Sequence, residues 1–176
     1  MEKDTINKYI FCDLDGVLNP IHHMNSTYKM YKASFGEIKS HDIYGQLFFN
    51  QNCDALKHII EQTGAKIVIS STWRINGLLT MQEMWKHRNL AGEVIDVTPN
   101  CDVIAYKYGK ILDEVKRGDE IQHYIDGYNI DKYVIIDDNE DFLKHQLPNF
   151  VKCNAYCGLT MKDAEKAIKI LNDDRF

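Results

Sequence analysis

The chain has 176 residues, of which 44% are hydrophobic and 27% are charged, and its formal net charge is −5. This length fits one domain with a substantial core, and the composition excludes a disordered chain. The acidic net charge argues against a broad basic surface, so duplex nucleic-acid binding is not expected. A net negative charge is nevertheless compatible with a local basic cleft.

The first half of the chain predicts a strand, a long loop, a helix and a second strand. The apolar run "KYIFCD" (8–13) has strand length and is typical of strands buried on both faces of a parallel sheet. Residues 19–50 lack a clear period, and a loop of that length after a strand is often a lid, a small cap or a recognition loop. The plainer alternative is an irregular surface excursion with one short helix or hairpin. A helix follows at 52–64, ending at Gly64, and then a strand at 65–70.

The second half alternates helices with strands. In chain order it predicts a helix at 78–88, a strand at 93–97, a helix at 118–127, strands at 132–137 and 149–154, and a helix at 160–172. The last helix begins at Thr160, three residues before Asp163, which is close to a capping box. Strands alternating with helices indicate an α/β fold with a mostly parallel sheet, in a single domain that spans residues 1–176.

Polar side chains gather where three of the predicted strands end. These clusters are Asp13 and Asp15 after the first strand, Ser70, Ser71 and Thr72 after the second, and Asp137 and Asp138 after the strand at 132–137. Ligands of an open parallel sheet bind outside the carboxyl ends of its strands, so we expect the clusters to share one rim. Oxygen-rich sites of this kind suit Mg²⁺.

Asp13 and Asp15 lie two residues apart in an extended segment, so both can face one pocket. With Mg²⁺ holding it ionised, Asp13 can attack phosphorus and form an aspartyl-phosphate. Asp15 can protonate the leaving oxygen and later activate water. Gly16 allows the backbone to approach a bound phosphate closely, which adds it to the predicted substrate-binding residues.

These segments resemble the motifs of the haloacid dehalogenase (HAD) superfamily of phosphohydrolases, in the family's order. "DLDGVL" (13–18) resembles the first motif, and "KIVISST" (66–72) the second, a strand ending in a Ser or Thr that binds the phosphoryl group. "RGDEI" (117–121) resembles the third, with Arg117 in place of the usual lysine, and "VIIDDNED" (134–141) resembles the acidic fourth. The resemblance implies a HAD-like Rossmannoid three-layer sandwich with a central, mostly parallel sheet and no large cap domain.

The resemblance also implies a role for each motif residue. Asp13 would be the nucleophile and a Mg²⁺ ligand, and Asp15 would be the general acid/base, with its backbone carbonyl also meeting the metal. Asp138 would bind the metal directly, with Asp137 beside it. Asp141 would orient a metal-bound water, although its spacing from Asp138 is one residue short of a common family pattern.

Two of these roles have neighbouring alternatives. Ser70 ends the apolar run and is favoured as the phosphate-binding hydroxyl, with Ser71 as the alternative. Arg117 is favoured in the lysine role, because a guanidinium can neutralise phosphate charge through a bidentate fork, with Lys116 as the alternative. A Ser-Ser-Thr cluster after a strand is also a common helix cap, and that role is compatible with phosphate binding.

Three further residues near the motifs are candidates for the site or its surroundings. "SSTWR" (70–74) resembles a subset of HAD domains without a large lid, some of them fused to nucleic-acid repair enzymes. Arg74 could contact a substrate phosphate or pair with a carboxylate at the rim. Asn19, just past the first motif, is expected to line the site, whereas Trp73 is expected to belong to the core.

Cysteines and targeting signals point to a reducing compartment. The five cysteines are an odd number, and the polar start "MEKDTINK" has no secretory signal, so free thiols are expected. No run of about 18 apolar residues occurs, so no membrane segment or membrane partner is expected. A cytoplasmic location is therefore predicted.

The function predicted from the sequence is Mg²⁺-dependent hydrolysis of a phosphomonoester. The segment between the second and third motifs (72–117) leaves no room for a large cap, and family members with open sites tend to act on large substrates. The phosphorylated substrate could be a nucleotide, a nucleic-acid end or a phosphoprotein. The alternatives are a phosphotransferase and a non-catalytic HAD-like protein that binds metal or phosphate. The oligomeric state stays open.

Overall fold

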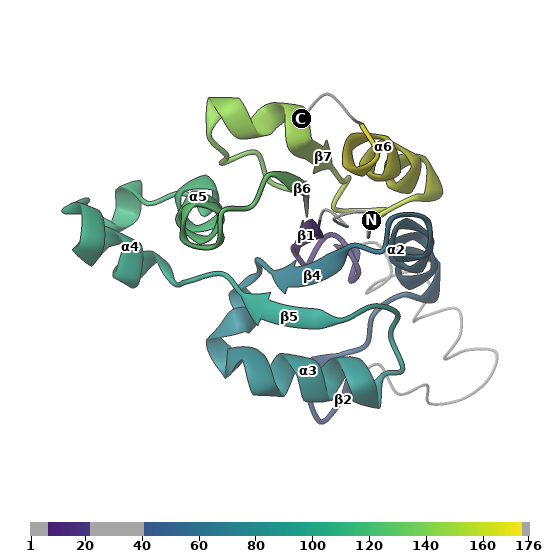
Figure 1. The fold of residues 1–176 in the computed structure, drawn as a ribbon. Coiled ribbons are helices and arrows are strands. Elements are labelled where there is room, and N and C mark those ends of the chain that lie inside the picture. The colour runs from purple at the N-terminus through teal and green to yellow at the C-terminus, as the bar shows by residue number, and fades with distance from the viewer. Residues whose placement is uncertain (1–6, 22–40, 174–176) are drawn as a thin grey trace, which may run out of the picture.

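A computed structural model describes residues 7–21 and 41–173 of the chain. Its central sheet has five parallel strands in the order β5-β4-β1-β6-β7 (Figure 1). The strands are β1 (Lys8–Cys12), β4 (Lys66–Ile69), β5 (Val94–Val97), β6 (Lys132–Asp137) and β7 (Phe150–Lys152). The sheet confirms the predicted α/β class and all five predicted strands, and it puts β1 at the centre.

Helices cover both faces of the sheet and give the predicted three layers (Figure 1). The α-helices are α2 (Asn50–Thr63), α3 (Gly77–His87), α4 (Cys101–Tyr108), α5 (Arg117–Tyr128) and α6 (Met161–Leu171). Short 3₁₀ helices lie at η2 (Thr72–Asn76), η3 (Leu112–Glu114) and η4 (Lys144–Asn149). The packing of α2, α3 and α6 on one face and of α5 on the other confirms four predicted helices, whereas α4 was not predicted.

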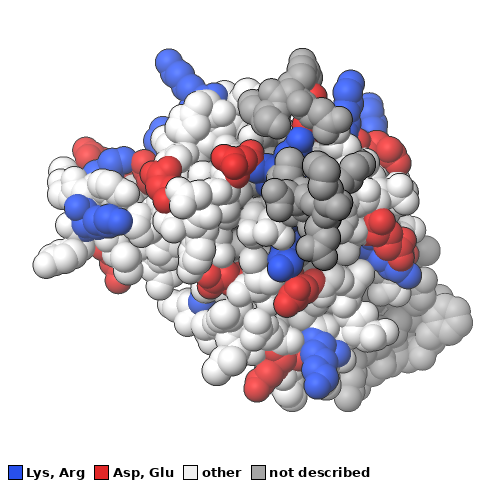
Figure 2. Space-filling view, in the orientation of Figure 1, with Lys and Arg blue, Asp and Glu red and all other residues white. Residues whose placement is uncertain are grey.

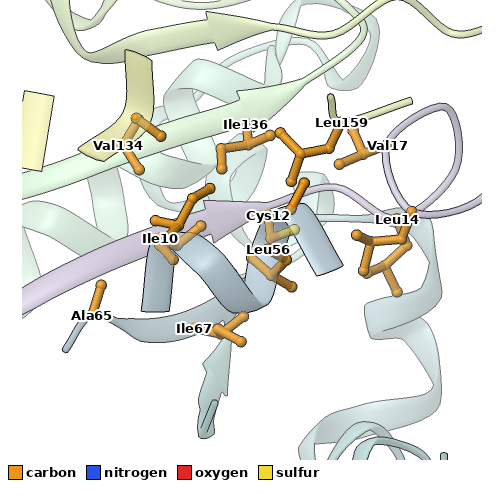
Figure 3. Close-up of a cluster of buried hydrophobic side chains, with 14 of the residues drawn as sticks. Ile10, Cys12, Leu14, Val17, Leu56, Ala65, Ile67, Val134, Ile136 and Leu159 are labelled. Atoms are coloured by element: carbon orange, nitrogen blue, oxygen red, sulfur yellow. The ribbon is translucent and has the colours of Figure 1, made fainter. Parts of the chain in front are cut away.

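Alternation along the strands divides the buried side chains into two cores. Ile10 and Cys12 of β1 face the larger core, where Figure 3 shows them near Leu56 of α2. Phe11, between them in sequence, faces the smaller core and packs edge-on against Tyr124 of α5, with ring centroids 5.6 Å apart. Because both faces of β1 are covered, the strand is uniformly apolar, and each fully buried large side chain stabilises the fold by about 1.5–3 kcal/mol.

Local signals end the helices where the sequence indicates. Helix α2 stops at Gly64, which adopts φ 66° and donates its N–H to the Ile60 carbonyl. Helix α6 begins after Thr160, whose side chain accepts from the Asp163 N–H in a capping box. All five cysteines are free, as predicted.

Part of the long segment after the first motif forms a small hairpin. Strands β2 (His41–Asp42) and β3 (Gly45–Gln46) pair antiparallel, and residues 22–40 before them lie outside the described part. Arg88, directly after α3, holds the hairpin through hydrogen bonds from Nε and Nη2 to the two Asp42 oxygens, at 2.9 and 2.8 Å. A short hairpin was one of the forms expected for this segment.

The stretch between the second and third motifs carries η2, α3, β5, α4 and η3 and no inserted domain. All of its residues are described, so the expected lack of a large cap at this position holds. Among the described residues, no helix has the length and apolar character needed to span a membrane.

Candidate active site

Three carboxylates meet at the carboxyl end of the two central strands. Strands β1 and β6 are parallel neighbours, and the Asp13 N–H continues their ladder by donating to the Ile136 carbonyl at 3.0 Å. One carboxylate oxygen from each of Asp13, Asp137 and Asp138 lies within 4.8 Å of the other two. Asp13 is only 5% exposed and Asp137 only 2%. The sheet thus brings together acidic residues that are more than 120 positions apart, as predicted from the polar clusters at the strand ends.

The electrostatics of this cluster suit a divalent cation. Burial raises the pKa of Asp137 to about 8, and the neighbouring charge of Asp13 adds to the effect. Burial likewise raises the pKa of Asp13, while Ser71 and Arg117 oppose the rise. Close carboxylates in dry surroundings repel one another, and a hard divalent cation with oxygen preference would offset that repulsion. The donor set therefore fits a divalent metal.

Gly16 makes room for Asp138. The glycine adopts φ +74°, and a Cβ placed on it would lie 2.5 Å from both Cγ and Oδ2 of Asp138. The turn that holds it is closed by backbone hydrogen bonds, including Gly16 N–H to the Asn19 carbonyl at 3.0 Å. The sequence predicted that Gly16 lets the backbone approach a bound phosphate. The structure adds a second reason for glycine here, because any side chain would collide with Asp138, a candidate metal ligand.

Both candidate hydroxyls follow β4 and are buried. The Ser70 N–H donates to the Cys12 carbonyl at 2.9 Å, which fixes the end of β4 beside β1. Ser71 lies close enough to Asp13 to lower the pKa of that carboxyl. Among the described residues, neither hydroxyl has a partner of full hydrogen-bond geometry. Of the two serines, Ser71 is thus the one that the structure brings to Asp13.

Arg117 supplies positive charge near Asp13. It is the first residue of α5, its side chain is 15% exposed, and its charge helps to lower the pKa of Asp13 and of Asp137. Its Nη1 is buried and has no hydrogen-bond partner within the described part of the chain. Lys116, the alternative in the lysine role, is an exposed residue at the N-cap of α5.

Arg74 pairs with a carboxylate that the sequence interpretation missed. Its Nη2 lies 2.6 Å from Oε1 of Glu120, and its Nη1 donates to the Ser71 carbonyl at 2.9 Å. Glu120 is 3% exposed and also faces Arg117, whose Nε lies 3.9 Å from Oε2. Burial raises the pKa of Glu120, and the two arginines oppose that rise. Arg74 thus pairs with a carboxylate, which is one of the two roles considered for it.

Asp15 has very different surroundings from Asp13. It is exposed, and each of its carboxylate oxygens accepts one side-chain hydrogen bond. Asn19 donates through Nδ2 to Oδ1 at 3.1 Å, and Trp73 donates through Nε1 to Oδ2 at 2.9 Å. Asn19, expected to line the site, thus lies in hydrogen-bond contact with Asp15. Trp73, expected in the core, is instead half-buried at the edge of the larger core and uses its polar atom on Asp15.

Asp141, in the loop after β6, contacts the first residues of α5. Its carbonyl accepts from the Gly118 N–H at 3.1 Å, and its Oδ2 accepts from the Arg117 N–H at 3.3 Å. Gly118 permits this close packing, because a Cβ on it would lie 2.7 Å from the Leu143 nitrogen. Asp141 was predicted to orient a metal-bound water, and its observed contacts join the loop of the fourth motif to the helix of the third.

Comparison with family models shows the family to which the chain belongs. The family model described as the HAD domain in Swiss Army Knife RNA repair proteins matches residues 9–164, and the chain belongs to this family. A solved structure from Legionella pneumophila, described as a HAD superfamily (subfamily III A) hydrolase, is similar with 14% identity and a TM-score of 0.40, over 94% of this chain and 84% of that chain. No match was found among curated proteins. The family supports hydrolase activity of the phosphatase type in general terms.

Proposed function

We propose that this chain is a Mg²⁺-dependent phosphomonoester hydrolase that works through an aspartyl-phosphate on Asp13. One observation carries the proposal: the buried Asp13 carboxylate lies within 4.8 Å of two further acidic side chains, and the positive charge of Arg117 is near enough to oppose the rise of its pKa. A nucleophile of this kind needs to stay ionised and to meet a phosphate without repelling it, and Arg117 together with a metal ion held by the carboxylates would serve both needs.

Asp13, Asp137 and Asp138 would hold the metal ion. When bound, Mg²⁺ would neutralise charge on the transferring phosphoryl group and on its carboxylate ligands. Asp138 would occupy the space that the missing Cβ of Gly16 leaves open.

The chain's own residues would carry out two displacements at phosphorus. A carboxylate oxygen of Asp13 attacks phosphorus, the bond to the leaving oxygen breaks, and Asp15 gives that oxygen a proton. Asp15 then takes a proton from water, whose oxygen attacks the phosphorus of the aspartyl-phosphate and breaks its bond to Asp13. The products are the alcohol and phosphate, and both aspartates return to their starting state.

Arg117 and the two serine hydroxyls would stabilise the phosphoryl oxygens during both displacements. Support comes from three buried donors, Arg117 Nη1 and the hydroxyls of Ser70 and Ser71, which lack hydrogen-bond partners among the described residues. Unpaired buried donors are costly in a folded protein, and a tetrahedral oxyanion offers each of them an acceptor.

We further propose that the substrate phosphate lies at the end of a nucleic-acid strand. The family's description refers to RNA repair proteins, and no inserted domain separates η2 from α5 to enclose a small substrate. For the described residues on one face, Figure 2 shows Lys and Arg interspersed with Asp and Glu. Such a surface fits recognition of a strand end at the site better than binding along a duplex.

A phosphate-release assay tests the proposal. The wild-type chain should release phosphate from 3′- or 5′-phosphorylated oligonucleotides faster than from nucleotides, sugar phosphates or phosphopeptides, and only with Mg²⁺. Asp13→Asn should lower turnover by on the order of a thousandfold or more, because the amide is a poor nucleophile. Asp113→Asn, an exposed change in η3, is the matched control and should keep wild-type turnover.

The same assay separates the alternatives. Phosphate appearing on an added alcohol in place of free phosphate would identify a phosphotransferase. Mg²⁺ binding without turnover of any phosphomonoester would identify a non-catalytic member. Undiminished Mg²⁺-dependent turnover by Asp13→Asn would contradict the assignment of the nucleophile.

A further inference from the structure

Asp15 needs a fixed orientation that the turn around it provides only in part. Unlike Asp13 it is exposed, and an exposed carboxylate samples several rotamers. A group that protonates a leaving oxygen has to be held within hydrogen-bond reach of it. The two hydrogen bonds from Asn19 and Trp73, one on each carboxylate oxygen, supply that restraint.

The two donors come from different parts of the chain. Asn19 belongs to the same turn as Asp15 and moves with it, since the Asn19 N–H donates to the Leu14 carbonyl at 3.0 Å. Trp73 belongs to η2 and lies 58 positions away from Asp15. Of these two donors, the tryptophan is therefore the one that ties the carboxylate to a separate element of the fold.

Trp73 is in turn held by the hairpin of β2 and β3. Its ring packs against Phe48 with centroids 5.6 Å apart, and its Cη2 would lie 3.4 Å from a Cβ placed on Gly45. The guanidinium carbon of Arg88 lies 5.6 Å from the centroid of the Trp73 ring and 4.5 Å from that of Phe48. The indole is thus enclosed by an aromatic ring, a glycine backbone and a cation.

Arg88 anchors this assembly to the body of the protein. It follows α3, its side chain is 5% exposed, and it binds both oxygens of Asp42. Its Nη2 also reaches the Gly45 carbonyl at 3.4 Å. A bidentate, buried arginine of this kind fixes the hairpin relative to α3 and, through the hairpin, the plane of the Trp73 ring.

The geometry points to Trp73 as a positioning residue for proton transfer, whose indole N–H orients Asp15 and whose ring is held by the β2–β3 hairpin and Arg88. This inference rests on the proposed function, because it assigns a step of that reaction to a contact in the structure. It goes beyond the motif residues by making the acid–base step depend on residues 41–49, which no motif includes.

A substitution that removes only the N–H tests the role. Trp73→Phe keeps an aromatic ring against Phe48 and deletes the donor to Asp15. Proton donation matters most for leaving groups that are poor anions, so we compare kcat/KM for phenyl phosphate with that for 2,4-dinitrophenyl phosphate. We expect the ratio of the two values to fall about tenfold, since general acids contribute roughly 10²–10⁴ and one of two orienting bonds is lost.

Trp85→Phe is the matched control. Trp85 donates its Nε1 proton to the Ala91 carbonyl at 2.9 Å and also packs against Phe48, with ring centroids 6.3 Å apart, so it loses a comparable bond away from Asp15. The control should leave the ratio of the two kcat/KM values unchanged. An unchanged ratio in Trp73→Phe would overturn the inference: an equal fall for both substrates would leave the indole with only a structural role, and no fall for either would leave it with no role in the reaction.

A second readout tests the contact without any turnover. The chain has two tryptophans, so ¹⁵N-labelled protein gives two indole N–H signals. Asp15→Asn replaces a charged acceptor by a neutral one and should move the Trp73 signal upfield while the Trp85 signal stays in place. A Trp73 signal that does not move would show that the contact is absent. If the wild-type protein shows no phosphatase activity while the Trp73 signal moves as expected, the proposed function and the kinetic role of Trp73 would be overturned. The contact between Trp73 and Asp15 would still be established.

Discussion

The two aspartates of the first motif are two residues apart, yet different parts of the fold hold them. Asp13 belongs to a carboxylate centre (Asp13, Asp137 and Asp138) that the backbone of β1 and β6 brings together. Asp15 belongs to an acid–base flank (Asp15, Asn19 and Trp73) made of side-chain hydrogen bonds at the surface.

The two aspartates are thus held by different kinds of contact, and each part of the site should respond to a different kind of change. The carboxylate centre is built into the ends of central strands, where position is fixed by the sheet, so it should respond mainly to changes of charge. The flank depends on packing between the hairpin, Arg88 and Trp73, so it should respond to changes of shape and hydrogen bonding. Substitutions in the carboxylate centre should therefore have larger effects than substitutions that support the flank.

Removing one charge from the carboxylate centre should have the largest effect. Asp138→Asn replaces a metal-ligand candidate by an amide, and we expect the rate with Mg²⁺ to fall on the order of 10³, since a catalytic metal supplies several kcal/mol. Mg²⁺ should also stop raising the melting temperature, whereas in the wild type it should add about 2.7 kcal/mol at a hundred times its dissociation constant. Asp131→Asn, an exposed change just before β6, is the control. Equal Mg²⁺ stabilisation in both variants would contradict the metal site.

The cation beside Asp13 should come next. Arg117→Ala should lower kcat/KM about a hundredfold, because it removes a donor aimed at the transferring charge. Lys116→Ala should change it by less than about threefold, because an exposed N-cap side chain contributes little. Arg117→Lys should recover part of the loss by restoring the charge. A larger loss in Lys116→Ala than in Arg117→Ala would move the role to Lys116.

Substitution of Gly16 distinguishes the effect of backbone strain from the effect of displacing Asp138. Gly16→Ala and Gly64→Ala each place a side chain at positive φ, which should cost about 1–2 kcal/mol of stability in both. Only Gly16→Ala also pushes on Asp138, so it alone should weaken Mg²⁺ binding, by about tenfold. Titration calorimetry with Mg²⁺ measures this. Unchanged Mg²⁺ affinity in Gly16→Ala would show that the carboxylate centre can rearrange, and would contradict the claim that the sheet fixes its position.

The anchor of the flank should give the smallest effect, and one that depends on pH. Hydrogen bonding from Arg88 lowers the pKa of Asp42 to about 2. Because this folded-state pKa lies below the unfolded value of 3.8, the pair stabilises the fold above about pH 4 and loses that effect as the pH falls toward 2. Arg88→Gln should therefore cost on the order of 1–2 kcal/mol near neutral pH and less at about pH 3, measured by urea unfolding. A cost that does not change with pH would mean that packing, and not the ion pair, holds the hairpin.

Sequence reasoning succeeded where the signals are local. The five strands were predictable because uninterrupted apolar runs of strand length need burial on both faces. The carboxylate centre followed from them, since residues after parallel neighbouring strands meet at one edge. Gly64 and Thr160 ended or began their helices because each acts within one turn.

The remaining features depend on contacts between distant parts of the chain. Glu120 and Arg74 pair across 46 positions, and nothing near either residue indicates the partner. Trp73 meets Asp15 only because η2 and the first turn converge at the rim. Helix α4 was missed because Ile104 is the one buried residue among its eight, which leaves no apolar stripe to recognise. The contact of Glu120 with Arg117, in contrast, had a local signal in "RGDEI", where Glu120 lies one helical turn after Arg117.

The central claim is that Asp13 becomes covalently phosphorylated. Asp15→Asn should slow hydrolysis of the intermediate more than its formation from 2,4-dinitrophenyl phosphate, which needs no proton for its leaving group. Acid quenching of that variant during turnover with Mg²⁺, followed by peptide mass spectrometry, should find one phosphoryl group on the peptide that carries Asp13. Phosphate release with no phosphorylated peptide, or with the phosphoryl group on another residue, would contradict the account.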